Sequence, residues 1–205
     1  MSTTSKRFAG RNAVITGASR GIGAALAHRL AAEGANVVLV ARTVDSHDHL
    51  AGSLRETAEQ CARNGVSVHV VEADLSDPQS RGAIIPKALD FFDGSIDILI
   101  NNAAAAIYND LLGYSLRRRQ VTFEVNVQAP ADLIQAVVPA MIDRGEGWIL
   151  NVSSASAAYE VGRRRVAPPV PPERLSTTMA VYGASKAALN RLTVAFAAAL
   201  ASPLR

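Results

Sequence analysis

The most informative residues of this chain are a tyrosine and a lysine four positions apart. Tyr182 and Lys186 belong to the stretch Tyr-Gly-Ala-Ser-Lys, and side chains with this spacing lie on one face of a helix. A phenol is a poor acid near neutral pH, but a neighbouring ammonium group stabilises the phenolate. The pair therefore predicts a tyrosine that donates a proton to a substrate oxygen or accepts one from it. Taken alone, a pair on a helix surface is the commoner explanation of this spacing.

A second candidate donor follows the apolar stretch that ends in Asn151-Val152-Ser153-Ser154. If this stretch is a strand of a parallel sheet, the serines stand at its carboxyl end, where open α/β folds bind their ligands. The Ser154 hydroxyl could then hydrogen-bond a substrate oxygen and stabilise the charge that develops there, with Ser153 as the adjacent alternative. A serine that only caps a turn is the other interpretation.

A glycine-rich turn predicts where a cofactor would bind. The segment Thr-Gly-Ala-Ser-Arg-Gly-Ile-Gly runs from Thr16 to Gly23, between an expected strand and an expected helix. Glycine lets a ligand approach the backbone closely, and the N–H groups and dipole at the start of a helix attract a pyrophosphate. This context favours a dinucleotide site over an ordinary tight turn. The candidate binding residues of the turn are Gly17, Ser19, Arg20, Gly21, Ile22 and Gly23.

The end of the next expected strand indicates which dinucleotide binds. Chains that bind NAD commonly have an acidic residue there, which accepts hydrogen bonds from the ribose hydroxyls. Here Ala41 is followed by Arg42, and no carboxylate stands at that place. Arg42 and Arg20 could form charge-assisted hydrogen bonds with a 2′-phosphate. We therefore expect NADP(H) to be favoured over NAD as the cofactor.

Short β-branched apolar runs alternate with longer helical segments along the chain. This alternation is typical of a parallel sheet whose strands are joined by crossover helices. It predicts an α/β protein with a doubly wound sheet of the Rossmann type. The expected strands are 12–16, 36–41, 66–72, 96–101 and 148–152, and the expected helices are 22–33, 48–64, 77–92, 116–144 and 181–201.

Composition excludes several classes of protein. The chain has 205 residues, of which 49% are hydrophobic and 19% charged, and this predicts one globular domain. The polar amino terminus and the lack of a long apolar run predict a cytoplasmic protein with no membrane partner. Cys61 is the only cysteine, which excludes an internal disulfide or a multi-cysteine metal site.

The net charge of +3 does not by itself indicate a nucleic-acid partner, because basic and acidic residues are mixed over most of the chain. The arginine triplets 117–119 and 163–165 are the exceptions. We interpret them as solvated faces, with an anionic substrate as the minor alternative.

Two segments near the carboxyl end carry further expectations. Four prolines between residues 155 and 180 exclude a continuous helix or central strand there. This stretch is expected to be a long surface loop, either a lid or binding loop or a disordered insertion. The last expected helix has apolar side chains nearly all round it, which favours burial on more than one side. A homodimer or homotetramer would provide this burial, and so would other parts of the chain.

With these motifs the chain resembles the short-chain dehydrogenase/reductase family of the type with TGxxxGxG and YxxxK motifs. The resemblance extends nearly from end to end. It implies one NADP-binding domain over residues 1–205, with strand order 3-2-1-4-5 in the sheet. It also implies that Asp74 and Leu75 contact the adenine, and that Asn102 and Ala103 belong to the cofactor site. Asn126 falls where the family has the asparagine of a catalytic tetrad, which Ser154, Tyr182 and Lys186 complete.

The family's mechanism implies a role for each member of this tetrad. Hydride passes between the nicotinamide and the substrate carbon, a carbonyl or a secondary alcohol, while Tyr182 moves the proton. Lys186 also holds the nicotinamide ribose, and Asn126 supports a water-linked proton relay to Lys186. Without the family, a capping or turn role is the simpler interpretation of Asp74, Asn102 or Asn126 taken singly.

The chain departs from the family in two places. The stretch 155–180 is longer than usual and is interpreted as an insertion rich in proline and arginine. The family's sheet normally has two further strands and a substrate loop, whereas this sequence ends at Arg205, so we expect a fragment or a truncated gene product. Two alternatives to a carbonyl reductase or alcohol dehydrogenase are an NADP(H)-binding regulatory module without turnover and a sugar-nucleotide epimerase or dehydratase. The glycine spacing disfavours a sugar-nucleotide epimerase or dehydratase.

Overall fold

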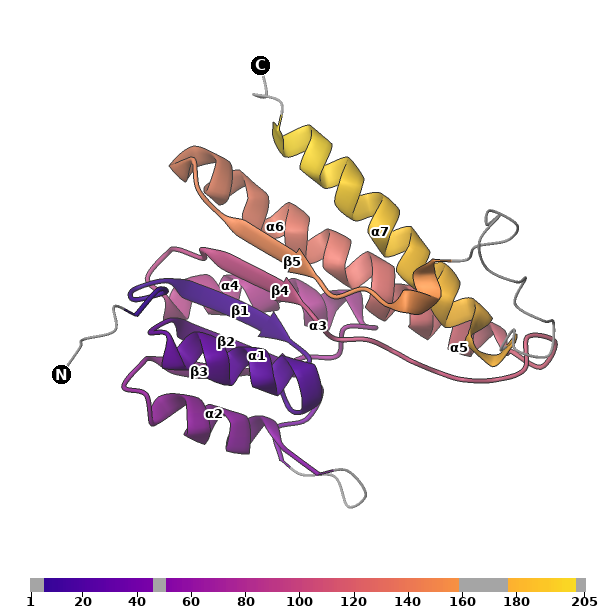
Figure 1. Ribbon diagram of the computed structural model, residues 1–205, viewed down its shortest axis with the longest axis horizontal. Helices are drawn as coiled ribbons and strands as arrows, with labels where there is room; N and C mark the ends of the chain where they lie inside the picture. The colour runs from indigo at the N-terminus through magenta and orange to yellow at the C-terminus, as the bar shows by residue number, and fades with distance from the viewer. Residues whose placement is uncertain (1–5, 46–50, 159–176, 202–205) are drawn as a thin grey trace, which may run out of the picture. The chain divides into compact units, whose positions relative to one another are not determined.

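Five parallel strands form the sheet of this protein. The computed structural model describes residues 6–45, 51–158 and 177–201. The strands lie in the order β3-β2-β1-β4-β5 (Figure 1), and every neighbouring pair is parallel. The predicted Rossmann-type fold and strand order are therefore confirmed, and the carboxyl ends of all the strands lie at one edge of the sheet. The strands are β1 Asn12–Thr16, β2 Asn36–Ala41, β3 Val68–Glu72, β4 Ile98–Asn101 and β5 Trp148–Asn151.

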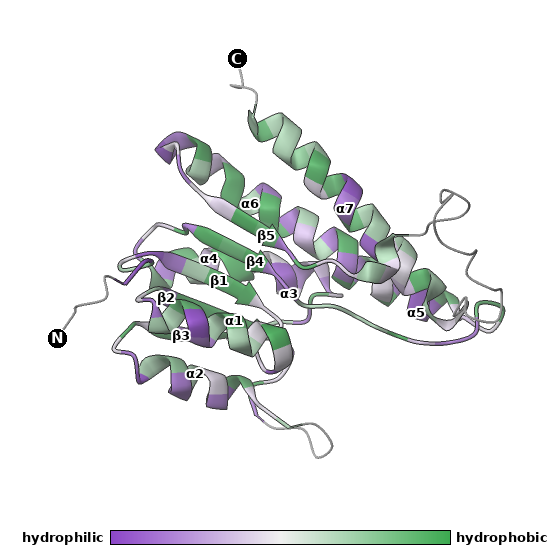
Figure 2. Ribbon diagram, in the orientation of Figure 1, coloured by the Kyte–Doolittle hydropathy of each residue, from purple (hydrophilic) through white to green (hydrophobic). Residues whose placement is uncertain are grey.

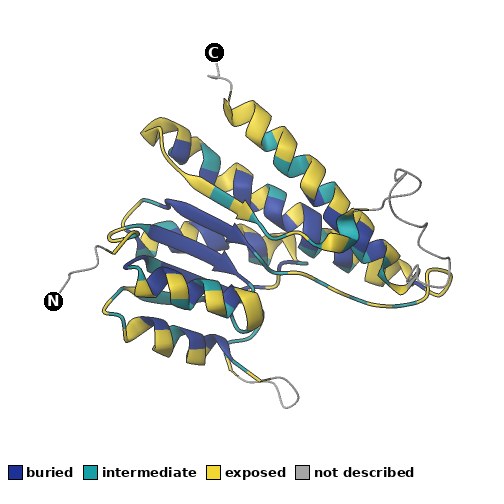
Figure 3. Ribbon diagram, viewed as in Figure 1, coloured by how far each residue is buried: buried dark blue, intermediate teal, exposed yellow. Residues whose placement is uncertain are grey.

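The central strands are buried on both faces. All residues of β1 and β4 are buried, as are the four inner residues of β2 (Figure 3). The same strands are hydrophobic except at their ends (Figure 2), as expected of a parallel sheet covered on both sides. The edge strand β5 differs, because Trp148 and Leu150 are 46% and 47% exposed.

Helices cover the two faces of this sheet. Helices α1 (Gly21–Ala32) and α2 (Leu54–Ala62) lie on one face, and α4 (Ile84–Phe91) and α6 (Ala129–Arg144) lie on the other (Figure 1). On the first face, Ile15 and Leu39 of the sheet belong to one core cluster with Leu54 and Cys61 of α2. Burial raises the pKa of the Cys61 thiol to about 11, so this side chain serves as a small apolar group in the core.

Three expected helices differ from the observed ones. The helix expected over 77–92 is divided into α3 (Pro78–Gly82) and α4, because Pro86 has no N–H to donate to the Gly82 carbonyl. The helix expected over 48–64 begins at Leu54 after its N-cap Ser53, and residues 46–50 lie outside the described part. The helix expected over 116–144 contains a π-helical turn, η1 (Glu124–Gln128), which separates α5 (Leu116–Phe123) from α6.

The chain divides into two compact units. The first comprises Met1–Ala103 with Ala129–Val152 and holds the sheet, and the second comprises Ala104–Gln128 with Ser153–Arg205. The single domain inferred from the sequence stays a prediction. The second unit contains α5, η1, α7 and two 3-10 turns, of which η2 is Ala155–Ala157 and η4 is Thr177–Met179.

Helix α7 (Ala180–Ala201) has apolar side chains that are open to solvent. Val194 is 62% exposed and Leu200 is 40% exposed. The homo-oligomer that would cover such side chains stays a prediction. No helix in the described part of the chain is long and apolar enough to cross a membrane. Most of the predicted insertion, residues 159–176, lies outside the described residues.

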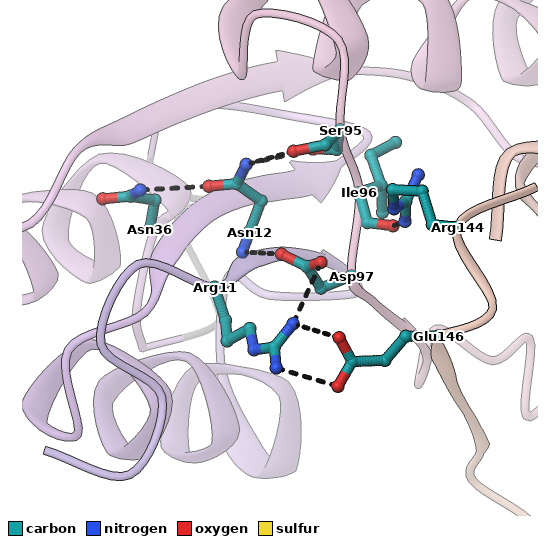
Figure 4. Close-up of polar contacts among 8 residues, drawn as sticks. All are labelled: Arg11, Asn12, Asn36, Ser95, Ile96, Asp97, Arg144 and Glu146. Carbon is teal, nitrogen blue, oxygen red and sulfur yellow. Dashed lines mark hydrogen bonds and ion pairs between the residues drawn. The ribbon is translucent and has the colours of Figure 1, made fainter.

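A polar network joins the amino ends of three strands (Figure 4). The Arg11 guanidinium donates two hydrogen bonds of 2.8 Å to Glu146 and lies 3.5 Å from the Asp97 carboxylate. Asp97 in turn accepts a hydrogen bond of 2.8 Å from the backbone of Asn12, and the guanidinium lies 4.9 Å from the centre of the Trp148 ring. The Arg11 hydrogen bonds also lower the pKa of Glu146. This Arg11 network holds the starts of β1, β4 and β5 together.

A second ion pair anchors the chain ahead of β1. The Arg7 guanidinium donates hydrogen bonds of 3.1 and 2.8 Å to the Glu33 carboxylate, which also pairs with Arg29 at 2.7 Å. The backbone of Phe8 donates a further hydrogen bond of 3.0 Å to the Glu33 carbonyl. The hydrogen bond from Arg7 lowers the pKa of Glu33 to about 2, so its carboxylate stays ionised in mild acid.

This low pKa predicts how stability depends on pH. The pKa of Glu33 falls from 4.5 to about 2 on folding, so its contribution is complete above pH 4.5 and is lost as the pH falls through about 2. The wild type should therefore exceed Glu33→Gln in free energy of unfolding at neutral pH, and the difference should shrink below about pH 4. Urea denaturation at a series of pH values measures this. Glu72→Gln, at an exposed acid of β3, is the control and should show a smaller, flatter difference. A Glu33→Gln difference independent of pH would contradict the prediction.

Candidate active site

The glycine turn is held in place by hydrogen bonds from the residues that follow β4. The buried Thr16 hydroxyl accepts hydrogen bonds from the backbone N–H groups of Asn102 and Ala103, at 3.1 and 3.2 Å. The Asn102 side-chain amide donates to the carbonyl oxygens of Thr16 and Gly17, at 3.0 and 3.2 Å. Asn102 therefore fixes the shape of the turn through its backbone and its side chain together.

Close backbone contact sets the position of the turn against α1. A Cβ atom on Gly23 would clash with the Gly17 carbonyl oxygen and with the Asn102 amide. Arg20 is the N-cap of α1, but its side chain makes no capping hydrogen bond. The first turn of α1 therefore presents backbone N–H groups without a side-chain cap, and such a helix end favours an anion.

Arg20 provides a further sign of an anion site. Its Nη1 atom is buried and has no hydrogen-bond partner, while its Nε lies 3.5 Å from the Ser19 hydroxyl. A buried guanidinium nitrogen without an acceptor is costly, and a phosphate oxygen would satisfy it. Gly21 and Ile22 at the start of α1 are exposed, as is Arg42 directly after β2. The residues present thus fit a phosphorylated dinucleotide.

The turn after β3 is organised by its own side chains. The exposed Asp74 carboxylate accepts hydrogen bonds of 2.8 Å from both the backbone and the hydroxyl of Ser76. Leu75 is buried, and its carbonyl accepts a hydrogen bond of 3.2 Å from Arg81. Arg81 is only 6% exposed and also forms an ion pair of 2.6 Å with Asp132 of α6. Asp74 and Leu75 therefore stand in a rigid turn at the carboxyl edge of the sheet.

In the second unit, Tyr182 and Lys186 lie on one face of α7. The Lys186 ammonium is 5.9 Å from the centre of the Tyr182 ring, as their spacing on a helix predicts. Lys186 is 2% exposed while Tyr182 is half-buried. Burial lowers the pKa of Lys186, so this side chain releases its proton more readily than a lysine in water does.

Asn126 connects this helix to the loop that begins the second unit. It lies in the π-helical turn η1 and is completely buried. Its side-chain oxygen accepts a hydrogen bond of 2.8 Å from the Ala105 N–H, and its amide nitrogen donates to the Ala105 carbonyl at 3.2 Å and to the Ser185 hydroxyl at 2.9 Å. Irregular turns of this kind are frequent at functional sites. Asn126 thus positions α7 at the residue next to Lys186.

Ser185 is a residue of this site that the sequence analysis missed. Its hydroxyl donates a hydrogen bond of 2.7 Å to the Tyr182 carbonyl while it accepts the bond from Asn126. The available signal was its place within the Tyr-Gly-Ala-Ser-Lys stretch, three residues after Tyr182 on the same helix. No local pattern pointed to Asn126 as its partner, because the two lie far apart in the sequence.

Ser154 takes part in a turn of its own. Its hydroxyl accepts a hydrogen bond of 3.2 Å from the Ser156 N–H and shares one of 2.9 Å with the Ser156 hydroxyl, and it caps the 3-10 turn η2. This turn packs closely on α7, because a Cβ atom on Gly183 would lie 2.6 Å from the Ser156 carbonyl oxygen. The close packing places the Ser154 turn against the helix residue next to Tyr182. Ser153, the adjacent alternative, is exposed.

Other candidates of the sequence analysis take no part in these contacts. Arginines 117–119 are exposed on α5, and arginines 163–165 lie outside the described residues. Within the described ranges, no three His, Cys, Asp or Glu side chains gather as they would around a metal ion.

Comparison with known proteins places these features in a family. The sequence pattern of the short chain dehydrogenase family matches residues 11–166. The chain is 38% identical over 151 residues to an L-rhamnose 1-dehydrogenase (NADP(+)) from Thermoplasma acidophilum, an alignment that covers 73% of this chain but only 57% of that enzyme. This chain therefore spans little more than half the length of that relative.

Solved structures of the same kind superpose on this chain. A metagenomic short-chain oxidoreductase in complex with NADP matches with a TM-score of 0.79 and 32% identity, over 94% of this chain and 77% of that one. An NAD+-bound xylitol dehydrogenase matches with a TM-score of 0.77 and 26% identity, over 95% of this chain and 66% of that one. Chains of this fold thus include proteins bound to either nicotinamide cofactor.

The contact at Gly183 yields a test of how tightly the Ser154 turn is held. Gly183→Ala would force a methyl group against the Ser156 carbonyl, and backbone cannot yield cheaply, so we expect a loss of about 1–3 kcal/mol in free energy of unfolding. Urea denaturation measures the loss. Gly113→Ala is the matched control in the same unit, because its Cβ would meet only the Asp110 carbonyl, at 3.9 Å. Similar losses in the two variants would show that η2 does not need this close contact.

Proposed function

Because the chain belongs to the short-chain dehydrogenase family, we propose that it interconverts a carbonyl compound and a secondary alcohol, with NADP(H) as the hydride carrier. The observation that carries the proposal is the position of Tyr182 on the same face of α7 as the buried Lys186, 5.9 Å from its ammonium. A buried ammonium beside a half-buried phenol stabilises the phenolate. It is useful where the phenol must lose and regain a proton.

The cofactor would be held by residues of the first unit. The uncapped start of α1 and the glycine turn would bind the pyrophosphate, and Asp74 and Leu75 would contact the adenine. Arg20 and Arg42 would bind the 2′-phosphate, and the orphaned Arg20 nitrogen supports this assignment. When bound, the nicotinamide supplies or accepts the hydride. NADP(H) is preferred because no carboxylate stands at the end of β2 to bind a ribose hydroxyl.

Tyr182 would carry the proton in both directions. In reduction, the carbonyl oxygen gains negative charge as hydride reaches the carbon, and the Tyr182 hydroxyl donates its proton to that oxygen. In oxidation, the phenolate accepts the proton of the alcohol. The Lys186 ammonium stabilises the phenolate, and its lowered pKa lets it pass a proton to water or return one to Tyr182.

Asn126 and Ser154 support this step in different ways. Asn126 is a positioning residue, because its side-chain hydrogen bonds join the Ala105 backbone and Ser185 of α7. Ser154 is held beside Gly183 by the η2 turn, and its hydroxyl would turn from Ser156 to the substrate oxygen when a substrate binds.

Removal of the Tyr182 hydroxyl tests the proposed reaction. Tyr182→Phe should lower kcat by about 10²- to 10⁴-fold, because the general acid is lost, while the Kd for NADPH stays within about twofold. Oxidation of NADPH with a panel of aldehydes and ketones measures kcat, and fluorescence titration measures Kd. The rival function, a module that binds NADP(H) without turnover, requires that no substrate be reduced faster by the wild type than by Tyr182→Phe.

Cofactor preference is tested at the two arginines. Arg42→Ala and Arg20→Ala should each weaken binding of NADPH about tenfold or more, because each removes a charge-assisted hydrogen bond worth about 1.5–3 kcal/mol. Binding of NADH should change by about twofold at most. Arg63→Ala, at an exposed arginine beyond α2, controls for the change in net charge. Equal weakening of NADPH and NADH would show that the arginines do not read the 2′-phosphate.

A further inference from the structure

The loop that opens the second unit is fixed at three points although it contains no helix or strand. Both backbone groups of Ala105 bond to the Asn126 side chain, at 2.8 and 3.2 Å. The Ile107 carbonyl accepts a hydrogen bond of 2.8 Å from the hydroxyl of the buried Tyr114. The Asn109 N–H donates one of 3.3 Å to the Thr178 carbonyl, just ahead of α7. The residue between the last two attachments, Tyr108, therefore has a well-defined backbone position.

Tyr108 brings an aromatic ring to the proposed proton donor. Its ring centre lies 6.4 Å from that of Tyr182, with the planes at 65°, an edge-to-face contact. Tyr108 nevertheless remains 57% exposed. The contact with Tyr182 thus uses only part of the Tyr108 ring and leaves apolar surface open beside the residue that would meet the substrate oxygen.

The polar side chains of the same loop are engaged with the loop itself. The Asn109 side chain accepts a hydrogen bond of 2.9 Å from the Asp110 N–H and donates one of 3.3 Å to the Gly113 carbonyl. The Asp110 carboxylate accepts one of 2.9 Å from the Leu112 N–H. What the loop offers to a ligand is therefore chiefly apolar, namely the Tyr108 ring and the exposed side chains of Leu111 and Leu112.

We propose that Tyr108 is a specificity-determining residue, and that the substrates are carbonyl compounds and alcohols with an aromatic ring next to the reacting carbon. The inference rests on the proposed function, because it takes Tyr182 as the proton donor. An aromatic substituent would stack on the open part of the Tyr108 ring while the carbonyl oxygen faces Tyr182. A polyol would find few free hydrogen-bonding groups on this loop, because Asn109 and Asp110 already have partners.

The test compares two ketones that differ only in the character of the ring. Acetophenone and cyclohexyl methyl ketone are reduced with NADPH by the wild type, Tyr108→Leu and Tyr108→Phe, and kcat/KM is measured for each. The wild type should prefer acetophenone, and Tyr108→Leu should lower the ratio of the two kcat/KM values about fivefold, mainly through KM. Tyr108→Phe should retain the ratio, and so should Leu116→Ala, at an exposed apolar residue of α5. General damage to the fold would lower both values and leave their ratio unchanged.

Two results would overturn the proposal. One is an unchanged ratio in Tyr108→Leu, and the other is a wild type that prefers the saturated ketone or reduces only polyol-type carbonyls. Calorimetric binding of 1-phenylethanol and 1-cyclohexylethanol provides a readout that needs no turnover. If neither ketone is reduced and Tyr182→Phe changes nothing, the proposed function has failed, and binding alone decides the role of Tyr108. Loss of 1-phenylethanol binding only in Tyr108→Leu would then support that role, and equal binding would refute it.

Discussion

In each of the two compact units, the proposed functional residues depend on backbone packed directly against backbone. At Gly23 the start of α1 touches the glycine turn, and at Gly183 the start of α7 touches the Ser156 carbonyl. A single methyl group at either position would separate the two segments. A methyl group at position 23 would move the start of α1 away from the glycine turn, with which it would bind the pyrophosphate. A methyl group at position 183 would move the Ser154 turn away from Tyr182. The proposed functional residues of both units are therefore positioned by contacts that only glycine permits.

Around these contacts, the residues that hold the site are distinct from those that would act in it. The side-chain amide of Asn102 bonds to backbone carbonyls of the glycine turn, and that of Asn126 bonds to the Ala105 backbone and to Ser185. Both residues connect segments that are distant in the sequence. Arg20 and Tyr182 have side chains with exposed or unsatisfied groups, as ligand-binding residues need. Lys186 is intermediate, because it is buried and its ammonium lies 5.9 Å from the centre of the Tyr182 ring.

Local sequence patterns predict the strands and helices of this protein better than the contacts between residues that are distant in the sequence. The strands β1 and β2 begin and end as expected, because β-branched runs that are buried on both faces have little alternative. The four-residue spacing of Tyr182 and Lys186 correctly predicts that the two side chains lie on one face of a helix. The π-helical turn at Asn126 was not foreseen, since its sequence suits an ordinary helix and its partner Ser185 is distant in the chain. The contact between Tyr108 and Tyr182 is equally non-local, and no periodicity encodes it.

The Arg11 network at the opposite edge of the sheet has a consequence for the behaviour of the protein in solution. Strand β5 is one of the two outer strands of the described sheet, and its exposed Trp148 lies beneath the Arg11 guanidinium. Charges at the start of an outer strand disfavour its pairing with a strand of another molecule. Added salt screens such charges, and it also weakens the bond between Arg11 and Glu146. Pairing of β5 with a strand of another molecule would accordingly be opposed most strongly in dilute buffer, where these charges are least screened.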